Sequence, residues 1–288
     1  MRLTAIDGAS YIYRAFYALP PLERSDGQQV GAVHGFCSML WKKLKEDRPT
    51  HIGVVFDAPG RKFRHDIDES YKANRTPPPP ELTSQFPLIR QAVDAFNLPQ
   101  IEAEGYEADD VIATVSMQVL NQGGQVSIVS SDKDFYQLLA HDGIEQWCPI
   151  KGRAIDRDDV VKKFGVGPEF AIDAQALIGD TSDNVPGVPG IGPKTAAQLI
   201  EQFGDLDSVL WNADYVSKPK IRQALIEHAD QARRSKELVT LNHDVPGVYV
   251  EHFSARDIDH TALLEFLDEM ELVTLKQDIL ADLEMGAV

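Results

Sequence analysis

Three carboxylates lie within four residues of the stretch Gly105–Val115 (GYEADDVIATV): Glu107, Asp109 and Asp110. Apolar residues follow them at helical spacing, which predicts a helix that starts at the carboxylates and faces a core with its later turns. Acidic side chains at a helix start can simply complement the helix dipole. Three close carboxylates also repel one another, so they are expected to share a positive partner or to have raised pKa values.

Other acidic residues follow apolar runs that are typical of buried β-strands. They are Asp7 after Arg2–Ile6, Asp57 after His51–Phe56, and Asp132 and Asp134 after Gln125–Val129. Helical patterns separate these runs, which predicts an α/β fold with a mostly parallel central sheet flanked by helices. Ligands of such sheets bind beyond the carboxyl ends of the strands. The acidic residues of these separate segments are therefore expected to converge on one edge, whereas scattered surface acids would not favour strand ends.

Helical patterns alone dominate the chain after about residue 155. We predict an α/β core over residues 1–155, a helical region over 156–245 and a small strand-and-helix appendage over 246–288 that packs on the core. The helices expected in the second region are Arg157–Phe164, Pro168–Ile178, Pro193–Phe203, Leu206–Trp211, Lys218–Glu227 and Asp230–Leu241. In the core, Val33–Leu44 is also expected to be helical, with one apolar face.

A glycine-rich loop, GVPGIGPK, is expected between two of these helices. Gly187, Gly190 and Gly192 allow backbone conformations closed to other residues, so exposed amides can approach an anion. A helix that begins at Pro193 points its N-terminus at the same place, and Lys194 adds a positive charge. This combination is suited to holding the phosphates of a duplex irrespective of sequence. A tight interhelical turn would also explain the glycines.

Two further carboxylates precede that loop. Asp180 and Asp183 are three residues apart and can present both carboxylates to one ligand. Asp183 and Asn184 can equally start a turn.

The segment Ala58–Thr83 is charged, poor in aliphatic residues and contains the run Pro77–Pro80. It is too long for an ordinary connection, and such loops are often functional. Five basic residues against three acidic ones give the stretch from residue 61 to residue 75 a local charge of +2. The basic residues are Arg61, Lys62, Arg64, Lys72 and Arg75.

The net charge of the chain is −17, from 28 basic and 45 acidic residues. A nucleic-acid partner is usually met by a basic surface, so this balance taken alone argues against one. Carboxylates that hold cations are neutralised in use, however. A second basic stretch, residues 218–236, has six basic and two acidic residues and a local charge of +4. The overall acidity therefore does not exclude nucleic acid.

Two cysteines, Cys37 and Cys148, lie far apart and give neither a disulfide framework nor a zinc signature. The sequence has no signal-peptide pattern and no apolar run of membrane-spanning length. We therefore expect a cytoplasmic protein without a membrane partner.

Three motifs in order, GYEADD, SSDKD and GDTSDNVPGVPGIGPKTA, resemble the structure-specific 5′-nuclease (flap endonuclease) superfamily. The nearest likeness is to the 5′→3′ exonuclease domain of bacterial DNA polymerase I, and it runs from AIDGASYIYRAF to the last helices. The resemblance implies a PIN-like 5′-nuclease core, an arch segment at about residues 58–90 and a helix-three-turn-helix motif at about 180–203. A polymerase portion is absent from this sequence, so we expect either a stand-alone exonuclease or a domain of a longer protein, with a DNA polymerase domain as a partner in cis or in trans.

The same resemblance implies a two-metal phosphodiesterase. Its acidic positions match Asp7, Asp57, Glu107, Asp109, Asp110, Asp132, Asp134, Asp180 and Asp183. Mg²⁺ prefers oxygen ligands, so two or more Mg²⁺ ions are expected, with Mn²⁺ as a substitute. Two such ions can activate water and stabilise the leaving oxygen. The helix-three-turn-helix motif of the family often holds K⁺ through backbone carbonyls.

Lys72 and Arg75, in YKANR, match the base of the family's arch and would add charge at the scissile phosphate. Together with Asp110 they are the residues to which we assign a catalytic role. Lys72 can alternatively be a solvated loop charge. Tyr71 is favoured to stack on an unpaired base, whereas a core role is at least as plausible for the aromatic residues near Asp7. The residues expected to contact DNA are Arg14, Tyr71, Lys72, Arg75, Gly187, Gly190, Gly192, Lys194 and Thr195.

The function expected is a monomeric, nucleoid-associated 5′-nuclease that cuts branched or nicked duplex DNA at 5′ flaps and 5′ ends, in replication and repair. One alternative is a module that only binds junction DNA, but nine acidic residues would give it nothing except self-repulsion. Another is a ribonuclease of the related PIN type. The glycine-rich loop argues against it, because that loop is suited to holding the backbone of a duplex. Replacement of Asp110 by Asn is expected to separate the enzyme from the binding module.

Overall fold

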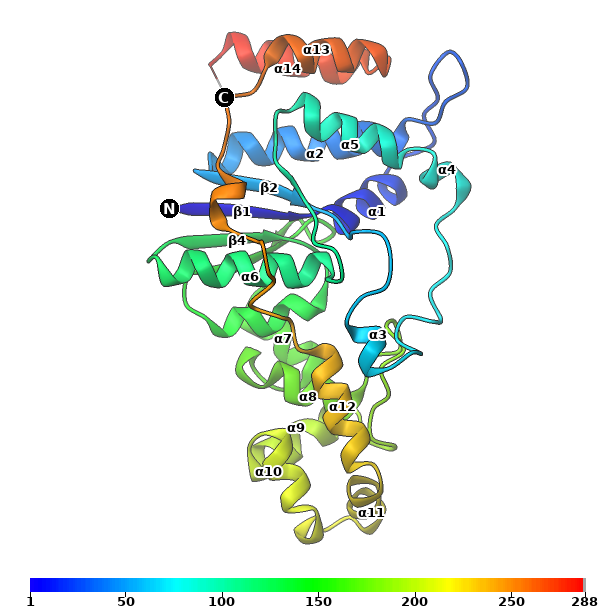
Figure 1. Cartoon of the computed structure of the whole chain (residues 1–288), viewed down its shortest axis with the longest axis vertical. Coiled ribbons are helices and arrows are strands. Elements are labelled where there is room, and N and C mark those ends of the chain that lie inside the picture. The colour runs from blue at the N-terminus through cyan, green and yellow to red at the C-terminus, as the bar shows by residue number, and fades with distance from the viewer. Residues whose placement is uncertain (287–288) are drawn as a thin grey trace.

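Residues 1–286 are described in a computed structural model of the chain (Figure 1), and the last two residues of the predicted 246–288 appendage lie outside them. A sheet of six strands in the order β3-β2-β1-β4-β5-β6 forms the centre. Its strands are β1 (Arg2–Asp7), β2 (His51–Val55), β3 (Gln100–Ile101), β4 (Gln125–Val129), β5 (Ile144–Cys148) and β6 (Arg153–Ala154). All neighbouring pairs are parallel except β5 and β6. The predicted mostly parallel α/β fold is confirmed.

The interior strands are buried on both faces, which explains their nearly continuous apolar sequences. Successive residues of β1 belong to the hydrophobic cores on opposite faces of the sheet. Ile6 packs with Phe36 on one face, and Ala5 packs with Val111 on the other. The first face is covered by α1 (Gly8–Ala18), α2 (Gly31–Asp47) and α5 (Phe86–Ala95), and the second by α6 (Ala108–Asn121) and the 3₁₀ helix Lys133–Ala140. The sheet is therefore the middle of three layers.

The apolar stripe predicted for Val33–Leu44 is buried along its whole length within α2. With 17 residues, α2 is the longest helix of the described chain. Within residues 1–286, no helix combines the length and the apolar character that crossing a membrane requires.

A helical region extends from the sheet at the lower end of Figure 1 and has its own core, which includes Val160, Leu199 and Leu225. It contains α7 (Arg157–Phe164), α8 (Ala171–Ile178), α9 (Pro193–Phe203), α10 (Leu206–Trp211), α11 (Pro219–Glu227) and α12 (Ala229–Val239), with short 3₁₀ turns at Pro168–Phe170 and Ala213–Tyr215. The sequence prediction of these helices is confirmed with small shifts at their ends. The largest difference is at Pro168, where a 3₁₀ turn precedes α8.

The segment Ala58–Thr83 has only two single-turn helices, α3 (Arg64–Ile67) and α4 (Pro80–Thr83). The helical arch that the resemblance implies is therefore mostly irregular backbone here. The run Pro77–Pro80 explains part of this, because proline lacks an N–H and disfavours a helical residue before it. Figure 1 shows this segment standing off the body of the molecule between α3 and α4.

The C-terminal segment contains a 3₁₀ helix at Val250–Phe253, then α13 (His260–Glu269) and α14 (Val273–Glu284). The strand predicted there is wrong for the described residues, because only an isolated bridge joins His51 to Ser254. Phe253 instead packs over the sheet face at Gly53, where a Cβ would come within 2.7 Å of its ring. The two helices pack on α2 and α5 through buried side chains such as Leu267 and Ile279.

Candidate metal centre and DNA-binding surface

Asp7 ends β1 and also begins α1. Its Oδ1 accepts a hydrogen bond from the Ser10 backbone N–H (3.1 Å), and its Oδ2 accepts one from the Ser130 hydroxyl (2.6 Å). Burial, together with the smaller effect of the nearby carboxylates of Asp132 and Asp57, raises the pKa of Asp7 to about 6 in spite of these hydrogen bonds. A cation beside Asp7 would therefore relieve an unfavourable charge.

The start of α6 is fixed by carboxylates at the carboxyl edge of the sheet. Asp57, after β2, accepts a hydrogen bond from the Ala108 N–H through Oδ1 (2.9 Å). Asp110 accepts one from the Glu107 N–H through Oδ2 (3.1 Å). The interpretation that acids at this helix start serve the helix itself thus fits Asp110, and Asp57, for which it was not proposed, also accepts from the first turn of α6. The same interpretation does not account for Asp109, whose carboxylate lies close to those of Asp132 and Asp134.

Five carboxylates form two groups that share Asp134. Asp109, Asp132 and Asp134 make one group and Asp134, Asp180 and Asp183 the other, with the oxygens of each group within 4.8 Å of one another. Burial raises the pKa of Asp134 to about 7, with a further contribution from Asp132. Burial and the same neighbour raise the pKa of Asp109 well above its usual value.

These donors are carboxylate oxygens only, which suit a hard divalent cation and do not provide the nitrogen or sulfur ligands typical of zinc. The residues present therefore fit a divalent metal site. Asp7 and Asp57 lie at the same sheet edge, as the strand ends predict, but the structure brings neither into the two groups.

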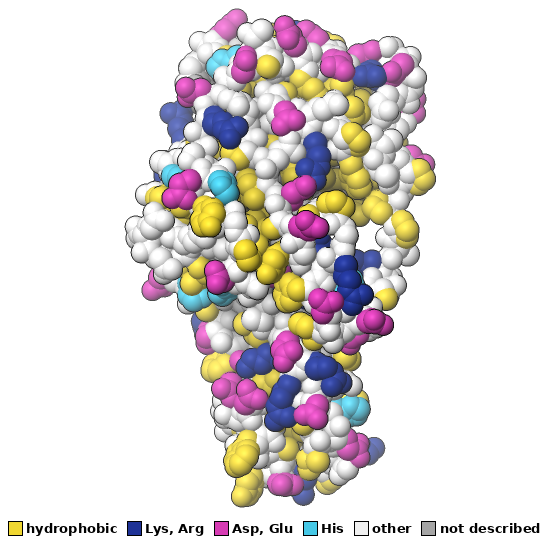
Figure 2. All heavy atoms as spheres, in the orientation of Figure 1, with side chains coloured by type: hydrophobic (Ala, Val, Ile, Leu, Met, Phe, Trp, Pro, Cys, Tyr) yellow, Lys and Arg dark blue, Asp and Glu magenta, His cyan; other side chains and the backbone are white. Residues whose placement is uncertain are grey.

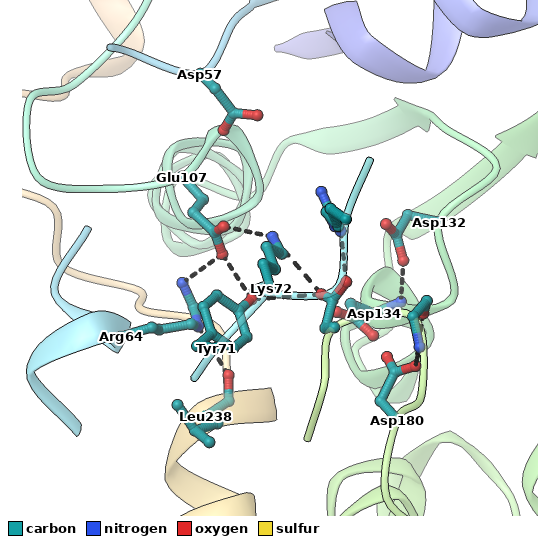
Figure 3. A network of polar contacts seen from close by, with 12 residues as sticks. Asp57, Arg64, Tyr71, Lys72, Glu107, Asp132, Asp134, Asp180 and Leu238 are labelled. Atoms are coloured by element: carbon teal, nitrogen blue, oxygen red, sulfur yellow. Dashed lines mark hydrogen bonds and ion pairs between the residues drawn. The ribbon is translucent and has the colours of Figure 1, made fainter. Parts of the chain in front are cut away.

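Basic side chains enter the acidic site from the irregular segment, as Figure 3 shows. Lys72 pairs with Glu107 and lies 3.6 Å from Asp183 Oδ2, and Arg75 Nη2 lies 2.5 Å from Asp183 Oδ1. Burial alone would raise the pKa of Glu107, but Lys72 and Arg64 together hold it below its usual value. The alternative that Lys72 is a solvated loop charge is therefore not supported.

The backbone at Lys72 is held in an unusual conformation. Its φ is +57°, in the left-handed region that a side chain rarely adopts, and its N–H donates to the Asp183 carbonyl oxygen (2.9 Å). Such conformations cost free energy and persist where the surrounding structure imposes them. Contact with the Asp180–Asp183 loop thus sets the direction of the Lys72 side chain.

Three polar residues of the site were not predicted. Arg64 pairs with Asp110 and Glu107, Lys133 pairs with Asp180, and Gln175 donates a hydrogen bond to Asp134 Oδ1 (2.8 Å). Lys133 lies between Asp132 and Asp134 in sequence, so its place in the site could have been predicted from its neighbours. Arg64 was only one of five basic residues in its stretch, and nothing local distinguishes it from Arg61.

The predicted base-stacking role of Tyr71 does not agree with its position. The residue is 4% exposed, and its hydroxyl donates to Glu107 Oε2 (3.0 Å). A base cannot reach a ring that is covered in this way. Tyr13 is exposed instead, and with Arg14 and Arg75 it lines a cavity of about 690 Å³ that also reaches Asp7.

The residues of the glycine-rich loop have different roles. A Cβ on Gly187 would lie 2.2 Å from the Ile178 carbonyl oxygen, so this glycine permits close packing of the loop against α8. Gly190 is exposed with a φ of +81°, and Gly192 is the N-cap of α9. Lys194 is exposed and Thr195 is half-buried in the first turn of α9. Binding of an anion stays a prediction, and it concerns only the end of the loop.

Lys and Arg side chains lie over the helical region on the face drawn in Figure 2, interspersed with acidic ones. Arg233 and Lys236 of α12 belong to this region, and each pairs both with Asp207 of α10 and with a second carboxylate. Figure 2 also shows an opening between the segment that links α3 to α4 and the body of the molecule.

Two family models match the chain. One describes the 5′-3′ exonuclease N-terminal resolvase-like domain and matches residues 2–165, and the other describes the 5′-3′ exonuclease C-terminal SAM fold and matches residues 166–261. DNA polymerase I of Rhizobium leguminosarum is 48% identical over 286 residues, which cover 96% of this chain and 28% of that protein. The chain thus spans about a third or less of the length of such relatives.

Solved structures show the same fold. A bacteriophage T5 flap endonuclease, in a pseudo-enzyme-product complex with DNA and metal ions, superposes with a TM-score of 0.67 at 22% identity, covering 94% of this chain and 100% of that one. Human GEN1 in complex with Holliday junction DNA superposes with a TM-score of 0.54 at 13% identity, covering 93% and 67%. Since the family models together match residues 2–261, the chain belongs to the 5′-3′ exonuclease family, as its motifs predicted.

Proposed function

We propose that this chain hydrolyses DNA phosphodiester bonds at 5′ flaps and 5′ ends, as a structure-specific 5′-nuclease of replication and repair. The observation that supports this most is the pair of carboxylate groups sharing Asp134 beside two basic side chains, Lys72 and Arg75. A pure junction-binding module would gain nothing from buried carboxylates whose pKa values burial raises.

In this proposal, two or more Mg²⁺ ions, or Mn²⁺ in their place, are held by the two carboxylate groups and by Asp7. When bound, such ions supply an activated water and stabilise the leaving oxygen. Ser130 orients the Asp7 carboxylate through the 2.6 Å hydrogen bond, and Gln175 orients that of Asp134. These contacts fix the oxygens of the site before a substrate arrives.

Lys72 and Arg75 are proposed to meet the charge of the scissile phosphate. Both lie at the carboxylates already, so their charged groups need only small movements to reach a phosphate bound beside Glu107 and Asp183. Preorganised donors of this kind stabilise charge that develops in a transition state.

A path for DNA is part of the proposal. The 5′ single strand would pass the opening beneath the segment between α3 and α4, and Arg14 and Arg75 would meet phosphates in the neighbouring cavity. The duplex would rest on the exposed end of the glycine-rich loop, with the amides of α9 and Lys194 toward its backbone. We also propose that backbone carbonyl oxygens of this loop bind K⁺.

The partners proposed are nicked or branched duplex DNA and a DNA polymerase domain in cis or in trans, because the curated relatives are DNA polymerases I. The nuclease itself is proposed to act as a monomer in the cytoplasm, near the nucleoid.

Cleavage of an end-labelled 5′-flap duplex tests the proposal. The wild-type chain is expected to cut near the flap junction with Mg²⁺ and not with excess EDTA. Asp134→Asn is expected to lose cutting at least about 100-fold, because both carboxylate groups need this residue. Tight flap binding without cutting in Mg²⁺ or Mn²⁺ would favour the binding module, and preferential cutting of an RNA flap would favour a PIN-type ribonuclease.

A further inference from the structure

Arg64 is a buried arginine with every N–H in use. It is 1% exposed, and its Nε donates to the Leu238 carbonyl oxygen (2.7 Å). Its Nη1 donates to Glu107 Oε2 (3.0 Å) and Asp110 Oδ2 (2.7 Å), and its Nη2 donates to Asp110 Oδ1 (2.7 Å) and the Thr240 carbonyl oxygen (3.0 Å). A guanidinium has five N–H donors, so none remains for a substrate.

Asp110 is equally saturated. Besides the two bonds from Arg64, its Oδ2 accepts from the Glu107 N–H (3.1 Å) and its Oδ1 from the Asn242 N–H (2.9 Å). An ionised carboxylate offers about four lone-pair positions. The side chain is fully buried, and it belongs to neither of the carboxylate groups that suit a metal.

We infer that Arg64 and Asp110 are a positioning pair for the nuclease site and that Asp110 is not a metal ligand. The inference rests on the proposed function and replaces the catalytic role that the motif alone assigned to Asp110. It also means that Asp110→Asn cannot separate a nuclease from a binding module, since a loss of activity would follow from lost positioning as well.

The pair joins three segments that are distant in sequence. Arg64 begins α3 in the irregular segment, Asp110 is in the first turn of α6, and Leu238 is in the last turns of α12. Figure 3 shows Arg64 reaching from α3 toward Glu107 on one side and Leu238 on the other. Its second bond, to Glu107, holds the same carboxylate that Lys72 contacts. The pair thus sets how the irregular segment, the acidic helix and the helical region meet.

Three variants separate a positioning role from metal ligation. Asp110→Asn and Arg64→Lys each break the five-bond pattern, and Arg64→Lys keeps the charge but not the planar fork. Asp109→Asn is the matched control, because Asp109 is the adjacent carboxylate and lies in a metal-suited group. For each variant the melting temperature in EDTA, the number and Kd of bound Mn²⁺ ions, and single-turnover flap cleavage well below that melting temperature are measured.

Asp110→Asn and Arg64→Lys are expected to lower the melting temperature by roughly 5 °C or more, because a buried pair is left incomplete. They are expected to keep the number of Mn²⁺ ions, to raise the Mn²⁺ Kd about 10-fold and to slow cleavage about 10- to 100-fold, because the first turn of α6, which also carries Asp109, loses its anchor. Asp109→Asn is expected to lose an ion without a lower melting temperature.

Loss of one Mn²⁺ equivalent in Asp110→Asn, as in the Asp109→Asn control, would show that Asp110 is a ligand and overturn the inference. If folded Arg64→Lys keeps the wild-type Mn²⁺ Kd and cleavage rate, the pair has only a structural role, and the inference is overturned as well. If the wild-type chain does not cleave, the proposed function fails, while ion number, Mn²⁺ Kd and melting temperature still decide the role of Asp110.

Discussion

Lys133 Nζ lies 2.6 Å from Asp180 Oδ2, so the start of the 3₁₀ helix Lys133–Ala140 is joined to the loop after α8 inside the acidic site. The same ammonium is 3.8 Å from Asp134 Oδ1, the residue common to both carboxylate groups. Lys133 therefore offsets the repulsion between carboxylates of the sheet edge and those of the helical region.

Lys133→Met is expected to lower the free energy of unfolding in EDTA by about 1–3 kcal/mol, because the partly buried carboxylates lose a charged hydrogen-bond donor. Urea denaturation measures this. Lys151→Met is the control, since Lys151 is exposed and Asp159 keeps its pair with Arg153, so a loss of less than about 1 kcal/mol is expected. Equal losses in the two variants would show that Lys133 has no special place in the site.

The pH dependence of stability follows from Asp7 and Asp134, whose pKa values are raised to about 6 and about 7, and from Asp109, whose pKa is raised well above its usual value. The folded state then binds more protons than the unfolded state between pH about 4 and those values, so stability in EDTA is expected to fall as pH rises through this window. The slope approaches about 1.4 kcal/mol per pH unit for each such group.

Asp134→Asn is expected to remove about a third of that slope, because Asp7 and Asp109 still contribute. Glu107 and Asp180, whose pKa values are lowered by basic partners, lose their contribution only at more acidic pH and do not affect the window. Melting temperatures measured from pH 4.5 to 7.5 check the prediction. A wild-type stability that rises steadily over this range would contradict it.

Lys72→Ala and Arg75→Ala are each expected to slow single-turnover cleavage by about 10²-fold, because the scissile phosphate loses a preorganised charge. Flap binding, measured by anisotropy in Ca²⁺, is expected to weaken much less. Arg61→Ala is the control, since Arg61 lies in the same segment but pairs with Asp66 at the exposed surface. Losses confined to binding would mean that both residues only hold DNA.

Lys194→Ala is expected to weaken duplex binding uniformly across DNA sequences, because its exposed ammonium at α9 is placed for a phosphate. The slope of log K against log salt concentration should fall by about one unit. Titrations of one duplex at several NaCl concentrations measure the slope. If only some DNA sequences lose affinity, Lys194 reads bases and the phosphate-clamp proposal is wrong.

The C-terminal helices are expected to contribute to the stability of the core. Ile279→Ala should cost about 2–5 kcal/mol of unfolding free energy, because Ile279 is fully buried against the sheet-covering helices. Leu280→Ala on the same helix is the control, since Leu280 is 37% exposed and should cost less than about 1 kcal/mol. Equal costs would mean that α14 does not pack as part of the core.

Local sequence patterns were enough to predict the sheet, most helices and the edge at which the acids meet. These features depend on local periodicity and on the rule that parallel strands end on one side, so Asp7, Asp57 and Asp132 could be placed without tertiary contacts. The glycine-rich loop and the basic residues Lys72 and Arg75 were likewise recognisable from short motifs.

Which acids face one another and which face a basic residue depends instead on long-range packing. Asp109 and Asp110 are neighbours in one motif, yet α6 turns the first toward Asp132 and the second toward Arg64, 46 residues away in sequence. Successive positions on a helix point about 100° apart, so adjacent carboxylates meet different surroundings. Burial of Tyr71 and the partners of Lys133 likewise depend on long-range packing, which no local pattern of residue types records.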